Sequence, residues 1–150
     1  MLVNIKEIEN INETQVEILC KKIDPDVLFL EKYIQLFSKK LFTKQNGDNV
    51  LIHVKDIFYI ETIEGRTFVY TDKNVLETDF RLYELEKQLV NYDFFRASKS
   101  LIINLQKIDT LSPELNRTFL AIMKNGYKVY ISRQYTKILK NILENKGGWL

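Results

Sequence analysis

Residues 94–104 read Phe94-Phe95-Arg96-Ala97-Ser98-Lys99-Ser100-Leu101-Ile102-Ile103-Asn104. Apolar residues stand at both ends of this stretch and surround a polar Arg-x-Ser-Lys-Ser centre. The ends are expected to form two short strands, at residues 95–98 and 101–104, that anchor in a core. The centre would then be an exposed bend that offers cations beside hydroxyl and backbone N–H donors, which is the chemistry that binds phosphate groups. An ordinary solvated turn is the alternative interpretation of this pattern.

Short strands and turns are predicted on both sides of this stretch. The expected strands span residues 50–54, 57–62, 67–71, 75–78, 108–111, 118–123 and 128–131. Helical spacing of Leu82, Leu85 and Leu89 predicts a short helix within residues 81–91, and a last helix is expected at about residues 134–144. The sequence therefore predicts a mainly β domain of the α+β class over residues 47–146, followed by a tail at 147–150 that begins with Gly147-Gly148.

A small ββα segment is expected in front of this domain, over residues 1–46. Alternating apolar and polar residues predict strands at 2–9 and 16–20, and Asp24-Pro25 predicts the start of a helix that Asp24 caps. The polar, glycine-bearing stretch 44–49 is expected to be a linker or a hairpin, and the boundary is placed there.

An apolar stripe follows the predicted helix start, at alternating spacings of three and four residues. Its members are Val27, Leu30, Ile34, Phe37 and Leu41. The stripe has two interpretations: it covers the sheet of its own domain, as most amphipathic helices do, or it forms an interface with another subunit.

The composition narrows the possible functions. A single cysteine, Cys20, excludes a disulfide framework and a zinc cluster. No signal peptide and no apolar run long enough to span a bilayer are visible, so a cytoplasmic protein is expected. The only histidine, His53, falls inside a predicted strand, and no phosphate-binding loop or nucleophile elbow accompanies it. We therefore expect no enzyme, no metal, no cofactor and no small-molecule substrate.

Charge is distributed unevenly along the chain. Residues 1–80 hold ten Lys/Arg against fourteen Asp/Glu, a net charge of −4, whereas residues 81–150 hold twelve against six, a net charge of +6. A basic half supports a surface for nucleic acid or for another acidic partner, although an imbalance of this size also arises by chance.

A second basic segment, residues 127–134, ends in Ser132-Arg133-Gln134 at the start of the last predicted helix. Ser132 can cap that helix, and the N-terminal amides favour an anion. Arg133 can reach a phosphate or, through two donors, a guanine edge. A plain helix cap followed by a solvated arginine is the alternative.

Taken together, residues 50–143 resemble the LytTR DNA-binding family of bacterial transcriptional regulators. The resemblance rests on six short landmarks in the family's order and spacing. They are Ile57-Phe58-Tyr59-Ile60-Glu61, Leu82-Tyr83-Glu84-Leu85-Glu86, Phe95-Arg96-x-Ser98-Lys99-Ser100, Ile103-Asn104-Leu105-x-Lys107-Ile108, Asn125-Gly126 and Val129-Tyr130-Ile131-Ser132-Arg133-x-Tyr135.

The resemblance implies a fold of about ten short antiparallel strands and a C-terminal helix, which reads duplex DNA through loops in successive major grooves. Arg66, Lys99 and Arg133 match base-contacting positions, and a one-residue slip at the first turn would put Thr67 in the place of Arg66. Residues beside these positions would suit phosphates: Arg96, Ser98, Lys107 and Gln134.

The resemblance also implies partners. Only about 46 residues precede the matching part, too few for the phosphorylatable receiver domain that many family members carry. The front half resembles that of small stand-alone regulators, which act as homodimers on promoter repeats and are often restrained by a membrane-bound inhibitory protein. The alternative function is a protein-interaction module, in which the basic face and the amphipathic helix bind an acidic partner or a membrane-associated regulator.

Overall fold

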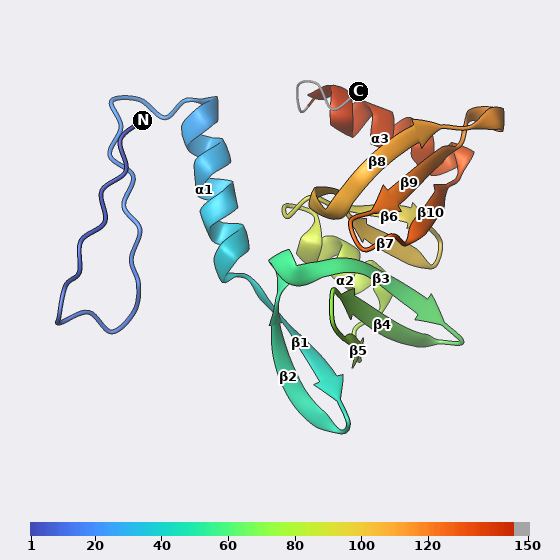
Figure 1. Ribbon diagram of the computed structural model, residues 1–150, viewed down its shortest axis with the longest axis horizontal. Coiled ribbons are helices and arrows are strands. Elements are labelled where there is room, and N and C mark those ends of the chain that lie inside the picture. Colours follow the sequence, from blue (N-terminus) through green and yellow to red (C-terminus); the bar gives the residue numbers. More distant parts are fainter. Residues whose placement is uncertain (146–150) are drawn as a thin grey trace.

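Two antiparallel sheets form the framework of the protein, as the computed structural model of residues 1–145 shows (Figure 1). A seven-stranded sheet has the order β2-β1-β5-β4-β3-β7-β6, and a three-stranded sheet has the order β10-β9-β8. The strands are β1 (Lys40–Gln45), β2 (Asp48–His53), β3 (Ile57–Ile63), β4 (Arg66–Thr71), β5 (Val75–Thr78), β6 (Phe94–Ser98), β7 (Leu101–Asn104), β8 (Ile108–Pro113), β9 (Phe119–Met123) and β10 (Lys128–Ile131). The predicted mainly β architecture is confirmed.

Three α-helices accompany the sheets: α1 (Pro25–Ser38), α2 (Leu82–Leu89) and α3 (Arg133–Asn145). Three short 3-10 helices join strands: η1 (Val54–Asp56), η2 (Leu105–Lys107) and η3 (Leu115–Arg117). Within residues 1–145, none of the helices is long and apolar enough to cross a membrane. The predicted stop at Gly147-Gly148 lies outside the described residues.

The seven-stranded sheet has a core on each of its faces. Ile102 belongs to the cluster that includes Leu85 and Leu89 of α2, whereas its neighbour Ile103 belongs to the cluster that includes the three-stranded sheet and Leu139 of α3. These side chains alternate because successive residues of a strand point to opposite faces. Each fully buried Leu or Ile contributes about 1.5–3 kcal/mol of stabilisation relative to an exposed one.

Of the two predictions for residues 44–49, a linker or a hairpin, the hairpin is confirmed, and β1 and β2 form it. Asn46 and Gly47, with φ of 52° and 85°, form a two-residue turn, and Gln45 pairs with Asp48 to close it. Lys44 of β1 pairs in turn with Glu77 of β5. The hairpin therefore lies across the predicted boundary at residue 47, and its first strand is part of the sheet.

The strands expected at residues 2–9 and 16–20 are absent, and this prediction was wrong. Residues 1–24 contain no strand and lie apart from both sheets (Figure 1). Their apolar side chains face solvent: Val3 is 75%, Ile5 91% and Leu19 86% exposed. An isolated two-stranded hairpin is only marginally stable in water, and these segments have no apolar face to pack on.

α1 begins as expected and ends earlier. The side chain of Asp24 accepts a hydrogen bond from Val27 N at 3.0 Å, and Pro25 is the first helical residue. The helix ends at Ser38, so Leu41 of the predicted stripe lies in β1, where it is buried in the core. Including Leu41 in an exposed interface was therefore wrong.

The other members of the stripe pack in neither core. Val27, Leu30 and Ile34 are half-buried and Phe37 is exposed. The helix is instead attached to the domain through another face. Lys32 Nζ lies 3.0 Å from Asp93 Oδ1, and Tyr33 donates to Gln106 Oε1 at 3.1 Å.

Candidate nucleic-acid interface

Two turns lie side by side at one end of the seven-stranded sheet. The β3–β4 turn is Glu64-Gly65, with φ of 49° and 78°, and the β6–β7 turn is Lys99-Ser100. β3 and β7 are neighbouring strands, and Thr62 N donates to Ser100 O at 2.9 Å. The β10–α3 junction lies toward the same side of the molecule, the right-hand side of Figure 1. This side therefore presents the segments that carry Arg66, Lys99 and Arg133.

Arg66 is exposed and held in place from one edge of its guanidinium group. Nε donates to Glu77 Oε1 at 2.9 Å and Nη2 donates to Glu77 Oε2 at 2.7 Å. The hydrogen bond from Arg66 holds the pKa of Glu77 below its ordinary value. The guanidinium also lies 5.2 Å from the ring centroid of Phe68. Thr67 is only 5% exposed, so Arg66 and not Thr67 is the residue that this turn presents.

Arg96, expected beside a phosphate, directs all three of its nitrogen atoms into the protein. Nε donates to Ser98 O at 2.8 Å, Nη2 to Lys99 O at 2.5 Å and Nη1 to Glu86 Oε2 at 2.8 Å. Its side chain is 20% exposed. Arg96 therefore stabilises the β6–β7 turn by binding two of its carbonyl groups, and it links the turn to Glu86 of α2.

The hydroxyl groups of the same turn interact with one another. Ser98 Oγ accepts from Ser100 N at 3.3 Å and lies 3.5 Å from Ser100 Oγ. Lys99 stands at the tip, exposed, and forms no ion pair with any residue in 1–145.

Arg133 is exposed at the first position of α3, and Gln134 is exposed beside it. Arg133 Nε donates to Asn116 O at 3.1 Å. Asn116 and Arg117 of η3 both have positive φ, at 64° and 61°, so this connection is a tight turn packed against the start of α3. The Ser132 carbonyl accepts from Thr136 N at 2.8 Å, which closes the first helical turn.

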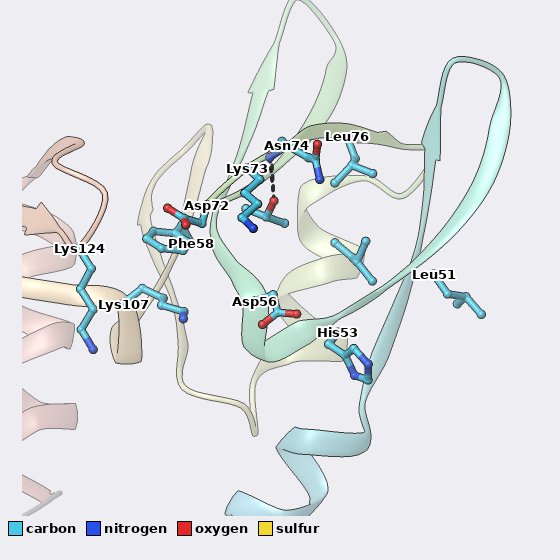
Figure 2. A pocket seen from close by; sticks show the side chains of 12 residues that line it. Leu51, His53, Asp56, Phe58, Asp72, Lys73, Asn74, Leu76, Lys107 and Lys124 are labelled. Carbon is cyan, nitrogen blue, oxygen red and sulfur yellow. Dashed lines mark hydrogen bonds between the residues drawn. The ribbon is translucent and has the colours of Figure 1, made fainter.

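Lys107 lies at the other end of the sheet. It ends η2, which follows the far end of β7, and its Nζ sits 5.0 Å from the ring centroid of Phe58. With Lys73 and Lys124 it lines an open hollow of about 760 Å³ (Figure 2). The structure therefore separates Lys107 from Arg66 and Lys99. His53 also lines this hollow, and its Nδ1 is buried without a hydrogen-bond partner among the described residues.

Two acidic residues of this surface were not predicted from the sequence as part of the site. Glu77 and Glu86 position Arg66 and Arg96 from elements that lie 11 and 10 residues away in the chain. No spacing rule within a strand or helix links such residues, since the pairing depends on strand register and on where α2 packs. Across residues 1–145, no group of three or more His, Cys, Asp or Glu side chains gathers as a metal site requires.

Comparison with known proteins identifies relatives of this chain. The chain is 32% identical over 123 residues to the sensory transduction protein LytT of Bacillus subtilis, an alignment that covers 82% of this chain and 51% of the relative. It is 30% identical over 138 residues to an uncharacterised HTH-type transcriptional regulator of Staphylococcus aureus strain NCTC 8325, covering 89% of this chain and 93% of the relative. The chain thus spans about half the length of the Bacillus subtilis relative and nearly all of the staphylococcal one.

A solved structure shows the same fold. The LytTr DNA-binding domain of a putative methyl-accepting/DNA response regulator from Bacillus cereus superimposes with a TM-score of 0.66 at 24% identity, over 71% of this chain and 97% of that one. Residues 47–144 also match the family model of the LytTr DNA-binding domain. Since that match covers well over half of the chain, the protein belongs to the LytTR DNA-binding domain family.

Proposed function

We propose that this protein is a cytoplasmic, sequence-specific transcriptional regulator that binds double-stranded DNA. The observation that carries the proposal is the grouping of Arg66, Lys99 and Arg133 on turns and a helix start at one side of a LytTR fold. Residues 47–146 would bind DNA, and the front segment 1–46 would serve assembly and control.

The two arginines suit base reading because each is anchored by its Nε. Arg66 Nε is held by Glu77 and Arg133 Nε by the Asn116 carbonyl. This anchoring, which in Arg66 also uses one N–H of Nη2, reduces the rotamer freedom lost on binding and leaves Nη1 and an N–H of Nη2 outside the anchoring bonds. These groups can donate two hydrogen bonds to guanine O6 and N7, which is the commonest specific contact in the major groove.

Lys99 suits a less directional contact. A lysine ammonium is a compact charge on a flexible stem, so the tip of the β6–β7 turn would meet a phosphate or a base acceptor with loose geometry. Ser98 and Gln134 lie beside the contact positions and would add neutral donors. The side-by-side β3–β4 and β6–β7 turns would enter one major groove and the β10–α3 junction the next, with the segment between them over the minor groove.

Phosphate neutralisation makes such binding sensitive to salt. Each neutralised phosphate contributes about 0.9 to the slope of log K against log salt concentration. Lys107 is left out of the contact set because it stands at the other end of the sheet.

The experiment is to select bound duplexes from a random pool and then measure binding of variants to the selected sequence. Lys99→Ala and Arg133→Ala should weaken binding, and Arg133→Ala should cost about 1–3 kcal/mol and relax the preference at one base pair. Lys107→Ala removes the same charge elsewhere and serves as the matched control, with little expected effect. Loss in Lys107→Ala together with indifference of Lys99→Ala and Arg133→Ala contradicts the site.

A second candidate function is supported by α1. Its Leu28 and Phe29 are 53% and 62% exposed, and with Tyr33, Leu105 and Leu143 they line a mainly apolar groove of about 900 Å³. We propose this groove as the place where a regulatory protein, such as a membrane-bound inhibitor, holds the regulator. Phe29→Asp should then leave DNA binding of the purified protein intact and release its target promoter from control in cells.

A further inference from the structure

β2 is an unprotected edge of the seven-stranded sheet. Among residues 1–145 it pairs only with β1, in a regular register without a bulge, from Lys40 opposite His53 to Gln45 opposite Asp48. In Figure 1 the β1–β2 hairpin extends away from the body of the protein. The other edge of the sheet differs: β6 carries a register shift between Arg96 and Ser98, and α2, α3 and β10 all contact it.

The hydrogen-bonding groups on this edge can be assigned from the register. Because the two-residue turn closes on Gln45 and Asp48, hydrogen-bonded pairs recur at every second position from there. Thr78 Oγ1 donates to the Phe42 carbonyl at 3.2 Å, so Phe42 directs its backbone toward β5. Its partner Leu51 therefore directs N–H and C=O away from β1. The same holds for Asn49 and for the N–H of His53, whereas the His53 carbonyl, at the N-cap of η1, accepts the first bond of that 3-10 helix. Five backbone groups are therefore left along the outer edge.

The side chains do not guard this edge. Natural edge strands are protected by lysine, proline, bulges or covering segments. Asp48–His53 contains no Lys, Arg or Pro. Leu51 is 52% exposed, and Phe42, directly across the hairpin from it, is 63% exposed. An unprotected edge beside an exposed apolar pair is a surface for strand addition.

We infer that β2 pairs antiparallel with β2 of a second copy of this chain, about a two-fold axis at Leu51. An axis perpendicular to the sheet keeps each face on its own side, so a residue meets only residues of the same face. Centred on Leu51, this register places Leu51 opposite Leu51 of the second copy, Asn49 opposite His53 and Val50 opposite Ile52. Polar residues meet polar ones and apolar residues meet apolar ones.

A second copy fits this edge because the strand is complementary to itself. The free outward groups form four hydrogen bonds, two between the Leu51 residues and one from each His53 N–H to the opposite Asn49 carbonyl, and the two sheets become one. Both Leu51 and both Phe42 side chains then gather on one face. A shift of the centre to Val50 would instead place Asn49 opposite Leu51 and Asp48 opposite Ile52, mixing polar with apolar. The inference goes beyond DNA binding and does not depend on it.

Cysteine cross-linking of the full chain tests the register. In a Cys20→Ser background, Leu51→Cys places two thiols across the axis, where Cα atoms of a hydrogen-bonded pair lie about 5.5 Å apart, within disulfide range. Mild oxidation should convert Leu51→Cys to a covalent dimer. Val75→Cys is the control, because Val75 is also an exposed apolar strand residue (54%) but lies on β5, away from the edge. Equal cross-linking of both variants, or cross-linking of Val50→Cys in place of Leu51→Cys, overturns this register.

Light scattering of purified protein tests whether the dimer interface lies at the β2 edge or at the apolar stripe of α1. Wild-type protein should be a dimer, and Leu51→Lys should raise the dimer dissociation constant by about tenfold or more, since two like charges face each other at the axis. Ile34→Asp, on the α1 stripe, should leave the dimer intact, and circular dichroism should show both variants folded. A monomeric wild type, or a dimer lost in Ile34→Asp and kept in Leu51→Lys, overturns the proposal.

Discussion

Arg66 and Glu77 face each other from neighbouring strands and are joined by two hydrogen bonds of 2.9 and 2.7 Å. Phe68, two residues after Arg66, is the register partner of Glu77, so the arginine reaches diagonally across β4 and β5. The pair is exposed, with 63% of the Arg66 side chain and 37% of the Glu77 side chain open to solvent. Exposed ion pairs contribute little to stability, so the consequence of this pair lies in how it orients Arg66.

Replacing Glu77 with Gln is expected to raise affinity for DNA of random sequence and to lower discrimination. The substitution removes a negative charge from a surface that meets phosphates, and it loosens the anchor on Arg66 Nε. Discrimination at one base pair should fall by part of the ~1–3 kcal/mol that a bidentate arginine supplies. Fluorescence anisotropy on the selected duplex and on a scrambled one measures both effects.

Glu64→Gln is the matched control, because Glu64 sits in the same turn, carries the same charge and makes no ion pair with the residues in 1–145. It should raise affinity for both duplexes without changing their ratio. An unchanged ratio in Glu77→Gln as well shows that Glu77 does not orient Arg66.

Arg96 is expected to act on DNA binding through Lys99 and not through a contact of its own. Its three nitrogen atoms hold Ser98 O, Lys99 O and Glu86, so removing it lets the β6–β7 turn relax. Arg96→Ala should weaken binding in the wild-type background and add little in a Lys99→Ala background. Interaction energies of this kind are what a double-mutant cycle measures.

The salt dependence separates the two roles. A phosphate contact at Arg96 would reduce the salt slope by about 0.9 on its own, in addition to the loss at Lys99. Additive effects of Arg96→Ala and Lys99→Ala, with an additive reduction in slope, identify Arg96 as a direct contact and contradict the bracing role.

The strands of the domain were predictable because each packs at least one face against a core. Periodicity placed strands at 95–98 and 101–104, and the structure has β6 (Phe94–Ser98) and β7 (Leu101–Asn104). The same rule failed at residues 2–9 and 16–20, since alternation marks a strand only where a neighbouring strand and a core exist. Leu41 continued a helical stripe in sequence, yet the chain turned into β1 before reaching it.

The sequence predicted which segments form the site, but it did not predict the role of each residue in them. The order of landmarks located the turns that carry Arg66, Lys99 and Arg133. β7 carries the chain from one end of the sheet to the other, and this is why Lys107 lies at the far end although it is only eight residues from Lys99. The roles of the arginines depend on acidic partners in other elements, which linear spacing does not show.

Asn104 is expected to be a stabilising residue and not a DNA contact. Its side chain is 1% exposed, Nδ2 donates to Ile57 O at 2.8 Å and Oδ1 accepts from Gln106 N at 3.0 Å. Asn104→Ala leaves both groups without this partner and should lower the free energy of unfolding by about 1–3 kcal/mol for each group that stays unsatisfied. The urea midpoint should fall while the slope of the transition stays the same.

Asn141→Ala on the exposed face of α3 is the control and should change stability by less than about 0.5 kcal/mol. DNA binding of Asn104→Ala, measured well below its midpoint, should match the wild type. A wild-type midpoint in Asn104→Ala shows that water or another donor replaces the side chain at no cost.

Alkaline pH is expected to unfold the protein through a stack of three tyrosines. Tyr59 lies between Tyr70 and Tyr127, with ring centroids 4.3 Å apart on each side and interplanar angles of 18° and 12°. Burial, and next the neighbouring phenols and Glu61, raise the pKa of Tyr59 well above its ordinary value, and burial also raises the pKa of Tyr70 and Tyr127. The stack joins the β9–β10 turn to β3, so it holds the three-stranded sheet on the larger one.

The sign of the effect follows from these shifts. The folded protein binds the phenolic protons more tightly than the unfolded chain, whose tyrosines titrate near pH 10. The contribution of the three phenols to the free energy of unfolding should therefore be constant below about pH 9 and fall as the pH rises above about 10, by at most about 1.4 kcal/mol per pH unit for Tyr59. Urea denaturation at a series of pH values between about 8 and 11 measures this dependence.

Tyr59→Phe keeps the stacked ring and removes the proton, so its stability should fall less steeply with pH than that of the wild type. Tyr130→Phe is the control, because Tyr130 is 67% exposed and lies outside the stack. Tyrosinate absorbance of the buried ring should appear together with unfolding. Equal slopes for wild type and Tyr59→Phe mean that the phenol of Tyr59 ionises without unfolding, and that the two sheets separate for another reason.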